Sequence, residues 1–286
     1  LMFRNKKILI TGASGFLAAY WIEALNKNNN KITLLINKKK NKICQKFETH
    51  EVNKIKSIKK FFIKNQFDYV INTASLADVN LCEKKPILAK LVHEDFVKKI
   101  AQAAKKTNAY LIHISTDHIF SGKNKIYTEV SKTKTINVYA RTKLNSERII
   151  KRYKLRRYLI IRGNFFGFGP SYKKTFLDWI VNRLKKNLFI HMVDDVYFSP
   201  LYITIFIDII NKLILLNKVG IYNVSSIDRI SKYTFALCVA KTLKLDDSKL
   251  LKKKSEDLFS VKRPKNMCLS PTKLIHDLKI NKINIS

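Results

Sequence analysis

The chain has 286 residues, 46% of them hydrophobic, which is enough for a sizeable core and suits one large domain or a domain with a smaller lobe. Its four scattered cysteines form no Cys-x-x-Cys pair, so the composition predicts neither a metal site nor a disulfide framework, and we expect a reducing, cytoplasmic location. The formal net charge of +35 comes from basic residues spread along the whole chain rather than gathered with aromatic residues in one patch, so we expect no specific nucleic-acid partner.

Strands and helices are expected to alternate from the start of the chain to Arg162. A short apolar run at Lys7–Thr11 predicts a buried strand, and a helical pattern follows at Phe16–Asn26. Further strands are expected at Lys31–Ile36, Tyr69–Asn72, Tyr110–Ser115 and Tyr158–Arg162, and further helices at Ser57–Lys64, Pro86–Lys106 and Tyr139–Tyr153. This alternation predicts an α/β fold, a doubly wound, Rossmann-like parallel sheet with helices on both faces.

The turn after the first predicted strand carries the spacing Gly12-x-x-Gly15-x-x-Ala18. Gly12 would allow a tight turn, and Gly15 would let the backbone approach a pyrophosphate held at the start of the helix. Glycines alone are a weak signal, but their place in the first strand–helix unit favours dinucleotide binding over a purely structural turn.

The second predicted strand ends in Asn37, followed by Lys38 and two more lysines. A site that prefers NAD usually places an acid here to hold the ribose 2′-hydroxyl. Because this strand end has lysines and no acid, it favours NADPH, with NADH remaining possible.

Tyr139 and Lys143 lie four residues apart, so they share one face of their predicted helix. A tyrosine has an ordinary pKa of roughly 10, and a nearby ammonium group stabilises its phenolate. Thr116 stands at the carboxyl end of the preceding strand, where ligands of open α/β sheets bind, and can orient a substrate carbonyl. The combination with the upstream glycine turn predicts a reductase centre made of Thr116, Tyr139 and Lys143.

The strand–helix alternation loosens beyond Arg162, where helices are expected at Trp179–Lys186, Ile203–Leu216 and Tyr233–Leu243. Asp208, Asn211 and Lys212 interrupt the second of these, so it predicts an amphipathic helix and no membrane span. We predict a dinucleotide-binding domain over residues 1–163 with 196–224 interleaved. Residues 164–195 and 225–286 would form a smaller, interleaved substrate-binding lobe.

The order of these motifs resembles that of extended short-chain dehydrogenases, and more narrowly the dTDP-4-dehydrorhamnose reductases. The segment His113–Ile149 carries the strongest likeness. Before it, Asn72–Pro86 resembles the family's alanine-rich turn and the stretch that follows it, and after it Arg162–Pro170, Asp194–Ile203 and Arg263–Leu274 resemble later landmarks. The resemblance implies an NADP(H)-dependent oxidoreductase of dTDP-rhamnose biosynthesis that reduces a 4-keto-6-deoxy sugar nucleotide. It also implies a homodimer formed through the helices at Pro86–Lys106 and Tyr139–Tyr153.

The resemblance also implies residue roles. Tyr139 would protonate the carbonyl oxygen, Lys143 would bind the nicotinamide ribose, and Thr116 would hydrogen-bond the same oxygen. The cofactor would contact Gly12, Ser14, Gly15, Phe16, Leu17, Asn37, Lys38, Glu51, Val52, Ala74, Ser75 and Leu76. The substrate would face His118, Asn164 and Phe165.

Two histidines depart from the family pattern. His118 stands where the reductases usually have tyrosine, and His93 stands where they usually have an asparagine that helps to fix the active-site backbone. We interpret His118 as a substrate contact, because Tyr139 already fills the acid role. Two alternatives stay open: an epimerase on the same fold, and a regulatory subunit of a partner enzyme that catalyses little.

Overall fold

A computed structural model of the chain describes residues 4–37 and 41–285. The chain divides into two compact units that interleave along the sequence. The first unit takes in the described residues up to Thr116 together with Val138–Arg162 and Ile207–Tyr222. The second takes in Asp117–Asn137, Gly163–Phe206 and the residues from Asn223 onward. The role expected of the second unit, substrate binding, stays a prediction.

A seven-stranded sheet organises the first unit, with the strand order β11-β6-β5-β4-β1-β2-β3. Its strands are β1 (Lys7–Thr11), β2 (Lys31–Ile36), β3 (Glu48–Glu51), β4 (Tyr69–Asn72), β5 (Tyr110–Ile114), β6 (Tyr158–Gly163) and β11 (Gly220–Val224). Every pairing from β3 through β6 is parallel. The order reverses at β1, whose neighbours β2 and β4 lie on its two sides, so the predicted doubly wound sheet is confirmed.

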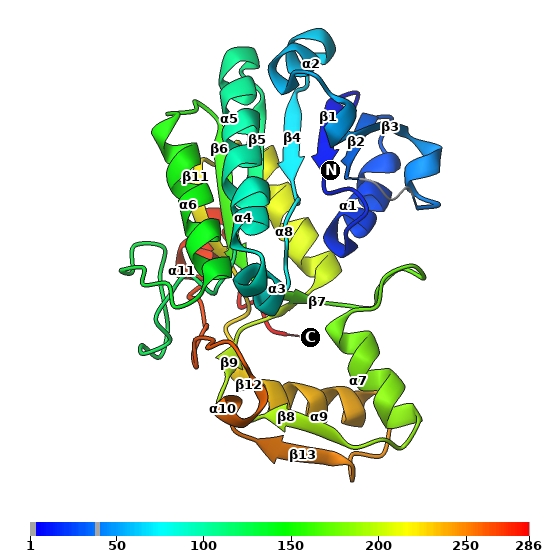
Figure 1. The fold of residues 1–286 in the computed structure, drawn as a ribbon, viewed down its shortest axis with the longest axis vertical. Coiled ribbons are helices and arrows are strands. Elements are labelled where there is room, and N and C mark those ends of the chain that lie inside the picture. The colour runs from blue at the N-terminus through cyan, green and yellow to red at the C-terminus, as the bar shows by residue number, and fades with distance from the viewer. Residues whose placement is uncertain (1–3, 38–40, 286) are drawn as a thin grey trace. The chain divides into compact units, whose positions relative to one another are not determined.

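Helices cover both faces of this sheet (Figure 1). They are α1 (Phe16–Asn26), α2 (Ile58–Asn65), α3 (Val79–Lys84), α4 (Pro86–Lys90), α5 (Phe96–Thr107), α6 (Val138–Arg152) and α8 (Ile203–Leu215). Figure 1 shows α5 and α6 in front of the strands and α8 behind them. On the rear face, the buried Trp21 of α1 donates from Nε1 to Asn211 of α8 at 3.0 Å.

A continuous apolar core lies between the sheet and the front helices. Its members come from alternate strand positions and from one stripe of each helix, because side chains repeat every second residue in a strand and about every 3.6 residues in a helix. Fully buried members include Leu9, Val70, Leu111 and Ile160 from the strands and Phe62 and Ile100 from the helices. This burial fixes which face of α5 and α6 meets the sheet and therefore which side chains the helices direct toward the strand ends.

The helix expected over Pro86–Lys106 is continuous in the structure from α4 to the end of α5, but its winding changes partway along. Between α4 and α5 the residues Leu91–Asp95 form a π-helical segment with one wider turn. Such bulges insert an extra residue per turn, shift the following side chains around the helix axis and are frequent at functional sites. His93 lies in this segment and is 1% exposed.

The second unit has its own apolar core and several short strands. Its helices are α7 (Phe176–Lys185), α9 (Lys232–Thr242), α10 (Ser255–Leu258) and α11 (Thr272–Leu278). Its strands are β7 (Phe165–Phe166), β8 (Ile190–Val193), β9 (Tyr197–Phe198), β10 (Leu201–Tyr202), β12 (Ile230–Ser231) and β13 (Leu250–Lys253). They pair two by two, β7 with β10, β9 with β12 and β8 with β13. A buried cluster that includes Ile180, Phe198 and Phe235 holds α7 and α9 against β8.

Candidate active site

The turn between β1 and α1 has the geometry that its glycines predict. Gly12 has a φ of +65°, and a methyl group added there would lie 2.7 Å from the backbone of Ala74, so this position requires glycine. The Gly15 N–H closes the turn on the Gly12 carbonyl at 2.8 Å, and helix α1 begins at Phe16. Ser14 and Phe16 are partly exposed, whereas Leu17 is buried. The amino end of α1, with its positive dipole, therefore follows directly after the close approach of Gly12 to Ala74.

The end of β2 places the residues expected near the adenosine. Asn37 is exposed directly after β2, and Lys38 lies outside the described residues. Glu51 pairs with Ile36 across β2 and β3, so an acid does stand beside this strand end, where its carboxylate accepts from Lys54 Nζ at 3.0 Å. Val52 packs against the front core, which gives it a structural role whatever it contacts besides.

The loop after β4 carries Ala74, Ser75 and Leu76. The Ala74 N–H donates to Asn72 Oδ1 at 3.3 Å, and Thr11 Oγ1 donates to the same oxygen at 2.6 Å. The Leu76 N–H and the Ser75 hydroxyl each lie 3.0 Å from Nε2 of His93. The loop is therefore anchored at both ends by side chains of neighbouring elements.

Helix α6 presents Tyr139 and Lys143 from one face, one turn apart. Lys143 is 2% exposed, and its Nζ donates to the carbonyl oxygen of Ile114 at 2.5 Å, at the carboxyl end of β5. Burial lowers the pKa of Lys143 to about 8, against an opposing effect from the Glu147 carboxylate. Tyr139 is partly exposed, and its ring meets the ring of His93 edge-on at 5.8 Å between centroids.

Thr116 comes two residues after Ile114 and is buried. The preceding residue, Ser115, donates from Oγ to Glu147 at 2.5 Å, and Arg162 donates to both oxygens of the same carboxylate at 3.0 and 2.7 Å. Through these bonds, Glu147 of α6 is connected to Ser115 after β5 and to Arg162 of β6. The structure thus brings the predicted residues Thr116, Tyr139 and Lys143 to the same end of the sheet.

A second buried chain of hydrogen bonds crosses the sheet beneath this end. Asn72 Nδ2 lies 2.9 Å from Nδ1 of His113, and Nε2 of His113 lies 2.8 Å from Ser146 Oγ, which donates to the Lys143 carbonyl at 2.6 Å. Because an amide nitrogen only donates, Nδ1 of His113 is the acceptor and Nε2 carries the proton. Burial and the Lys143 charge lower the pKa of His113 well below its ordinary value, which agrees with a neutral ring.

The residues expected to contact substrate lie in the second unit. Asn164 donates to Asp117 at 3.1 Å, and the His118 ring lies 4.0 Å from the other oxygen of that carboxylate. Phe165 packs against Phe206 with 4.9 Å between ring centroids. Burial lowers the pKa of His118, against an opposing effect from Asp117.

Lys232, at the start of α9, joins this group and was not found from the sequence. Burial lowers its pKa to about 7, against the attraction of Asp117, and its Nζ lies 3.2 Å from the Phe198 ring centroid. The sequence does not predict the roles of Glu147, Arg162 and the pair Asn72–His113 either. No local signal marks any of them in a chain so rich in lysine, because their partners are distant in sequence.

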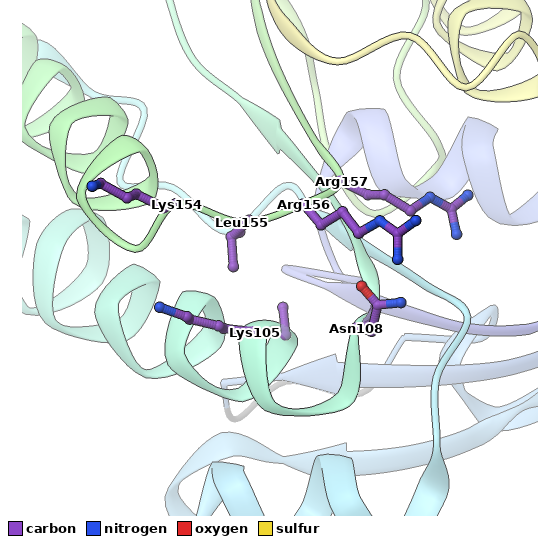
Figure 2. Close-up of a pocket in the computed structure, with 8 residues that line it drawn as sticks. Lys105, Asn108, Lys154, Leu155, Arg156 and Arg157 are labelled. Atoms are coloured by element: carbon purple, nitrogen blue, oxygen red, sulfur yellow. The ribbon is translucent and has the colours of Figure 1, made fainter.

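A pocket of about 210 Å³ lies at the other end of the sheet, where β5 and β6 begin (Figure 2). It is lined by Ala104, Lys105, Asn108, Ala109, Lys154, Leu155, Arg156 and Arg157, which precede β5 and β6 or end the helices before them. In Figure 2 the lysine side chains extend to one side and the arginine side chains to the other, so the cations do not converge. Lys105 lies in the last turn of α5, where the helix dipole favours a basic residue. Arg157 donates to Asn217 at 2.9 Å and lies over the Tyr110 ring, so contacts within the protein account for its position.

Among the described residues, no group of three or more histidine, cysteine or acidic side chains could hold a metal ion. Over the same residues, no helix has both the length and the apolar character needed to cross a membrane.

Comparison with known proteins gives a consistent result. The family described as "RmlD substrate binding domain" matches residues 6–284. A dTDP-4-dehydrorhamnose reductase of Salmonella typhimurium is 32% identical over 136 residues, an alignment that spans 46% of this chain and 44% of that relative. The chain thus spans less than half the length of that curated relative. A reductase of the same name from Aggregatibacter actinomycetemcomitans is 28% identical over 94% of this chain and 92% of its own.

Solved structures and a second kind of relative complete the picture. A dTDP-4-dehydrorhamnose reductase from Clostridium acetobutylicum is 26% identical, with a TM-score of 0.82 over 94% of this chain and 91% of that one. One from Bacillus anthracis in complex with NADP is 23% identical, with a TM-score of 0.84 over 98% and 95% of the two chains, and shares the fold. The methionine adenosyltransferase 2 subunit beta of Pongo abelii is 24% identical over 94% of this chain and 82% of its own.

Proposed function

We propose that this chain, which belongs to the RmlD substrate binding domain family, reduces the 4-keto group of a 6-deoxy sugar nucleotide with NADPH. The observation that carries the proposal is the position of Lys143. Its buried Nζ donates to Ile114, so the turn of α6 that bears Tyr139 and Lys143 is held at the strand end that leads into Thr116. The full-length likeness to a dTDP-4-dehydrorhamnose reductase supports the substrate class.

The residues around the β1–α1 turn fit a dinucleotide. The close approach of Gly12 to Ala74 leaves no space for a side chain, and the amino end of α1 offers N–H groups and a positive dipole to a pyrophosphate. Gly12, Ser14, Gly15, Phe16 and Leu17 would hold that group. When bound, NADPH would supply the hydride.

The end of β2 supports a phosphorylated ribose. Asn37 is an amide donor, and the carboxylate of Glu51, the acid paired with Ile36 at this strand end, forms an ion pair with Lys54 that offsets part of its charge. The remaining cofactor contacts that we propose are Glu51, Val52 and Lys38 near the adenosine, and Ala74, Ser75 and Leu76 beside the nicotinamide half.

The reduction needs a proton as well as a hydride, because negative charge develops on the carbonyl oxygen. Tyr139 would donate that proton from its hydroxyl group. Lys143, as an ammonium ion, would stabilise the resulting phenolate and bind the nicotinamide ribose. The hydroxyl of Thr116 would donate a hydrogen bond to the same carbonyl oxygen. His118, Asn164 and Phe165 would contact the sugar nucleotide.

The test is turnover of a panel of 4-keto-6-deoxy sugar nucleotides with NADPH, followed by product analysis. The wild-type chain should consume one NADPH for each product formed. Tyr139→Phe should lose about 10²- to 10⁴-fold in turnover and keep its affinity for NADPH, because only the proton donor is removed. Lys143→Met should lose both turnover and NADPH affinity.

The other outcomes identify the alternatives. Interconversion of two sugar nucleotides without net NADPH consumption would indicate an epimerase. A Tyr139→Phe variant that turns over at the wild-type rate would refute the proposed acid. If the wild-type chain reduces none of the panel, the reductase proposal fails, and a regulatory subunit, as the likeness to methionine adenosyltransferase subunit beta suggests, takes its place.

We also propose a cytoplasmic homodimer. The four cysteines are free, which fits a reducing compartment. The surface of α4 and the π-helical segment exposes Ile87 (76%), Leu91 (52%) and Leu88 (40%), and a second copy of α4 and α5 would cover this apolar group. Light scattering on the purified chain should give twice the monomer mass. Ile87→Glu should lower that mass, and a monomeric wild type would contradict the proposal.

A further inference from the structure

His93 lies between the two parts of the candidate site that must keep their relative positions. One is the loop of Ser75 and Leu76, which is proposed to line the cofactor. The other is α6, which carries Tyr139 and Lys143. His93 belongs to neither, since it comes from the π-helical segment, and its side chain is 1% exposed.

Hydrogen bonds connect the ring to both parts. On one side Nε2 accepts from the Leu76 backbone N–H at 3.0 Å, with the Ser75 hydroxyl at the same distance. On the other side Nδ1 lies 2.8 Å from Oγ1 of Thr142. Thr142 is buried on α6 between Tyr139 and Lys143. Both nitrogens are therefore used, each toward a different element.

The partners determine where the proton of the ring lies. A backbone N–H can only donate, so Nε2 of His93 must be unprotonated. The neutral ring then carries its proton on Nδ1 and donates it to Thr142. The Thr142 hydroxyl in turn donates to the Val138 carbonyl at 3.0 Å, with the Tyr139 carbonyl at 3.1 Å. Each donor in this series of hydrogen bonds therefore has an acceptor. A protonated His93 ring would donate from both nitrogens, so Nε2 could no longer accept from the Leu76 N–H.

The surroundings keep the ring neutral. Burial and the ammonium group of Lys143 lower the pKa of His93 to about 3. The rings of His93 and Tyr139 are nearly perpendicular with 5.8 Å between centroids, so a displacement of the histidine would change the packing of the tyrosine.

We propose that His93 is a positioning residue, a neutral Nδ1–H bridge that ties the Ser75–Leu76 loop to α6 and so fixes the cofactor side of the site relative to Tyr139 and Lys143. The effect that we expect on turnover rests on the proposed function. An imidazole suits this position because it spans the loop and the helix with one acceptor and one donor.

The experiment compares His93→Leu with His93→Asn, Thr142→Val and a control. His93→Leu removes both bonds, and we expect turnover to fall about 100-fold with a smaller change in KM for the sugar nucleotide, because misplaced groups slow the chemical step more than they weaken binding. His93→Asn keeps an acceptor and a donor and should recover most of that loss. Thr142→Val cuts the bridge at the other end. It therefore tests the bridge even if His93→Leu does not fold.

Combining the variants separates positioning from packing. If the bridge acts as one unit, Thr142→Val should slow the wild-type chain about tenfold and the His93→Leu chain less than twofold. The matched control is Asn145→Ala on the same helix, which loses a bond to Glu94 of the same π-helical segment at 3.0 Å and should leave turnover within twofold of wild type. Independent, multiplicative losses from His93→Leu and Thr142→Val, or an Asn145→Ala loss equal to that of His93→Leu, would overturn the proposal.

A readout without substrate separates this proposal from the proposed function. The Leu76 amide should exchange its hydrogen about tenfold faster in His93→Leu, while Asn145→Ala leaves its exchange unchanged. If the wild-type chain reduces no sugar nucleotide but Leu76 exchange responds in this way, the bridge stands and the reductase proposal fails. If Leu76 exchange does not respond, the bridge itself is wrong.

Discussion

The buried ion pair between Glu147 and Arg162 joins α6 to β6 at the active-site end of the first unit. Its side chains are 1% and 3% exposed, and the carboxylate accepts two bonds from Arg162 and one from Ser115. Glu147→Gln keeps the shape but removes the charge, and its amide nitrogen faces a donor. Removing one partner of a buried pair costs about 3–5 kcal/mol, and we expect the lower end because the glutamine keeps one acceptor oxygen.

Urea unfolding at pH 7 measures this loss as a lower midpoint at an unchanged slope. The matched control is Asp194→Asn, which removes an ion pair to Lys254 whose side chains are 27% and 57% exposed. Such an exposed pair contributes less than about 1 kcal/mol. If Glu147→Gln changes the unfolding free energy no more than Asp194→Asn does, the argument from burial is wrong.

The same substitution should also change the pH dependence of turnover. The Glu147 charge raises the pKa of Lys143, which burial has lowered to about 8. Without that charge the pKa of Lys143 falls further, so the ammonium form is lost at a lower pH. The alkaline limb of the turnover profile should therefore move to lower pH in Glu147→Gln. A profile that stays in place would show that Lys143 does not act as the ammonium ion.

Further predictions address the cofactor, the acid limit of stability and the charge. Gly12→Ala should weaken NADPH binding about tenfold or more in calorimetric titration, because φ is +65° and the added methyl group meets Ala74; a twofold change would contradict the turn geometry. NADPH should bind more tightly than NADH in the same titration, and equal affinities would remove the argument from the end of β2. Because the pKa of His93 is about 3 when folded and 6.5 ordinarily, the unfolded chain binds more protons between these values, so stability should fall as pH drops from about 6.5 toward 3, with a shallower fall in His93→Asn. Any DNA binding should be independent of sequence and should vanish steeply as salt rises, and a selective complex at physiological salt would contradict this.

Local sequence patterns determined most of the first unit. The strands at Lys7–Thr11, Lys31–Ile36 and Tyr69–Asn72 and the helix at Phe16–Asn26 have the bounds that their apolar periodicity predicts. The glycine turn was equally readable, because a tight strand-to-helix turn requires particular residues within a few positions. In each case the information lies within one element or its immediate flanks.

Tertiary packing decided the features that join distant elements. Nothing in the stretch Leu91–Asp95 predicted its π-helical turn, because an amphipathic pattern fits an unbroken helix equally well. The tautomers of His93 and His113 depend on partners supplied by other strands and helices, and so does the pairing of Glu147 with Arg162. The tyrosine and lysine of α6 were identifiable from their spacing alone, but the groups that bury and orient them were not. Spacing is a local property of the chain, whereas the burial and hydrogen bonding that set the charge and position of a side chain exist only when segments far apart in sequence have packed together.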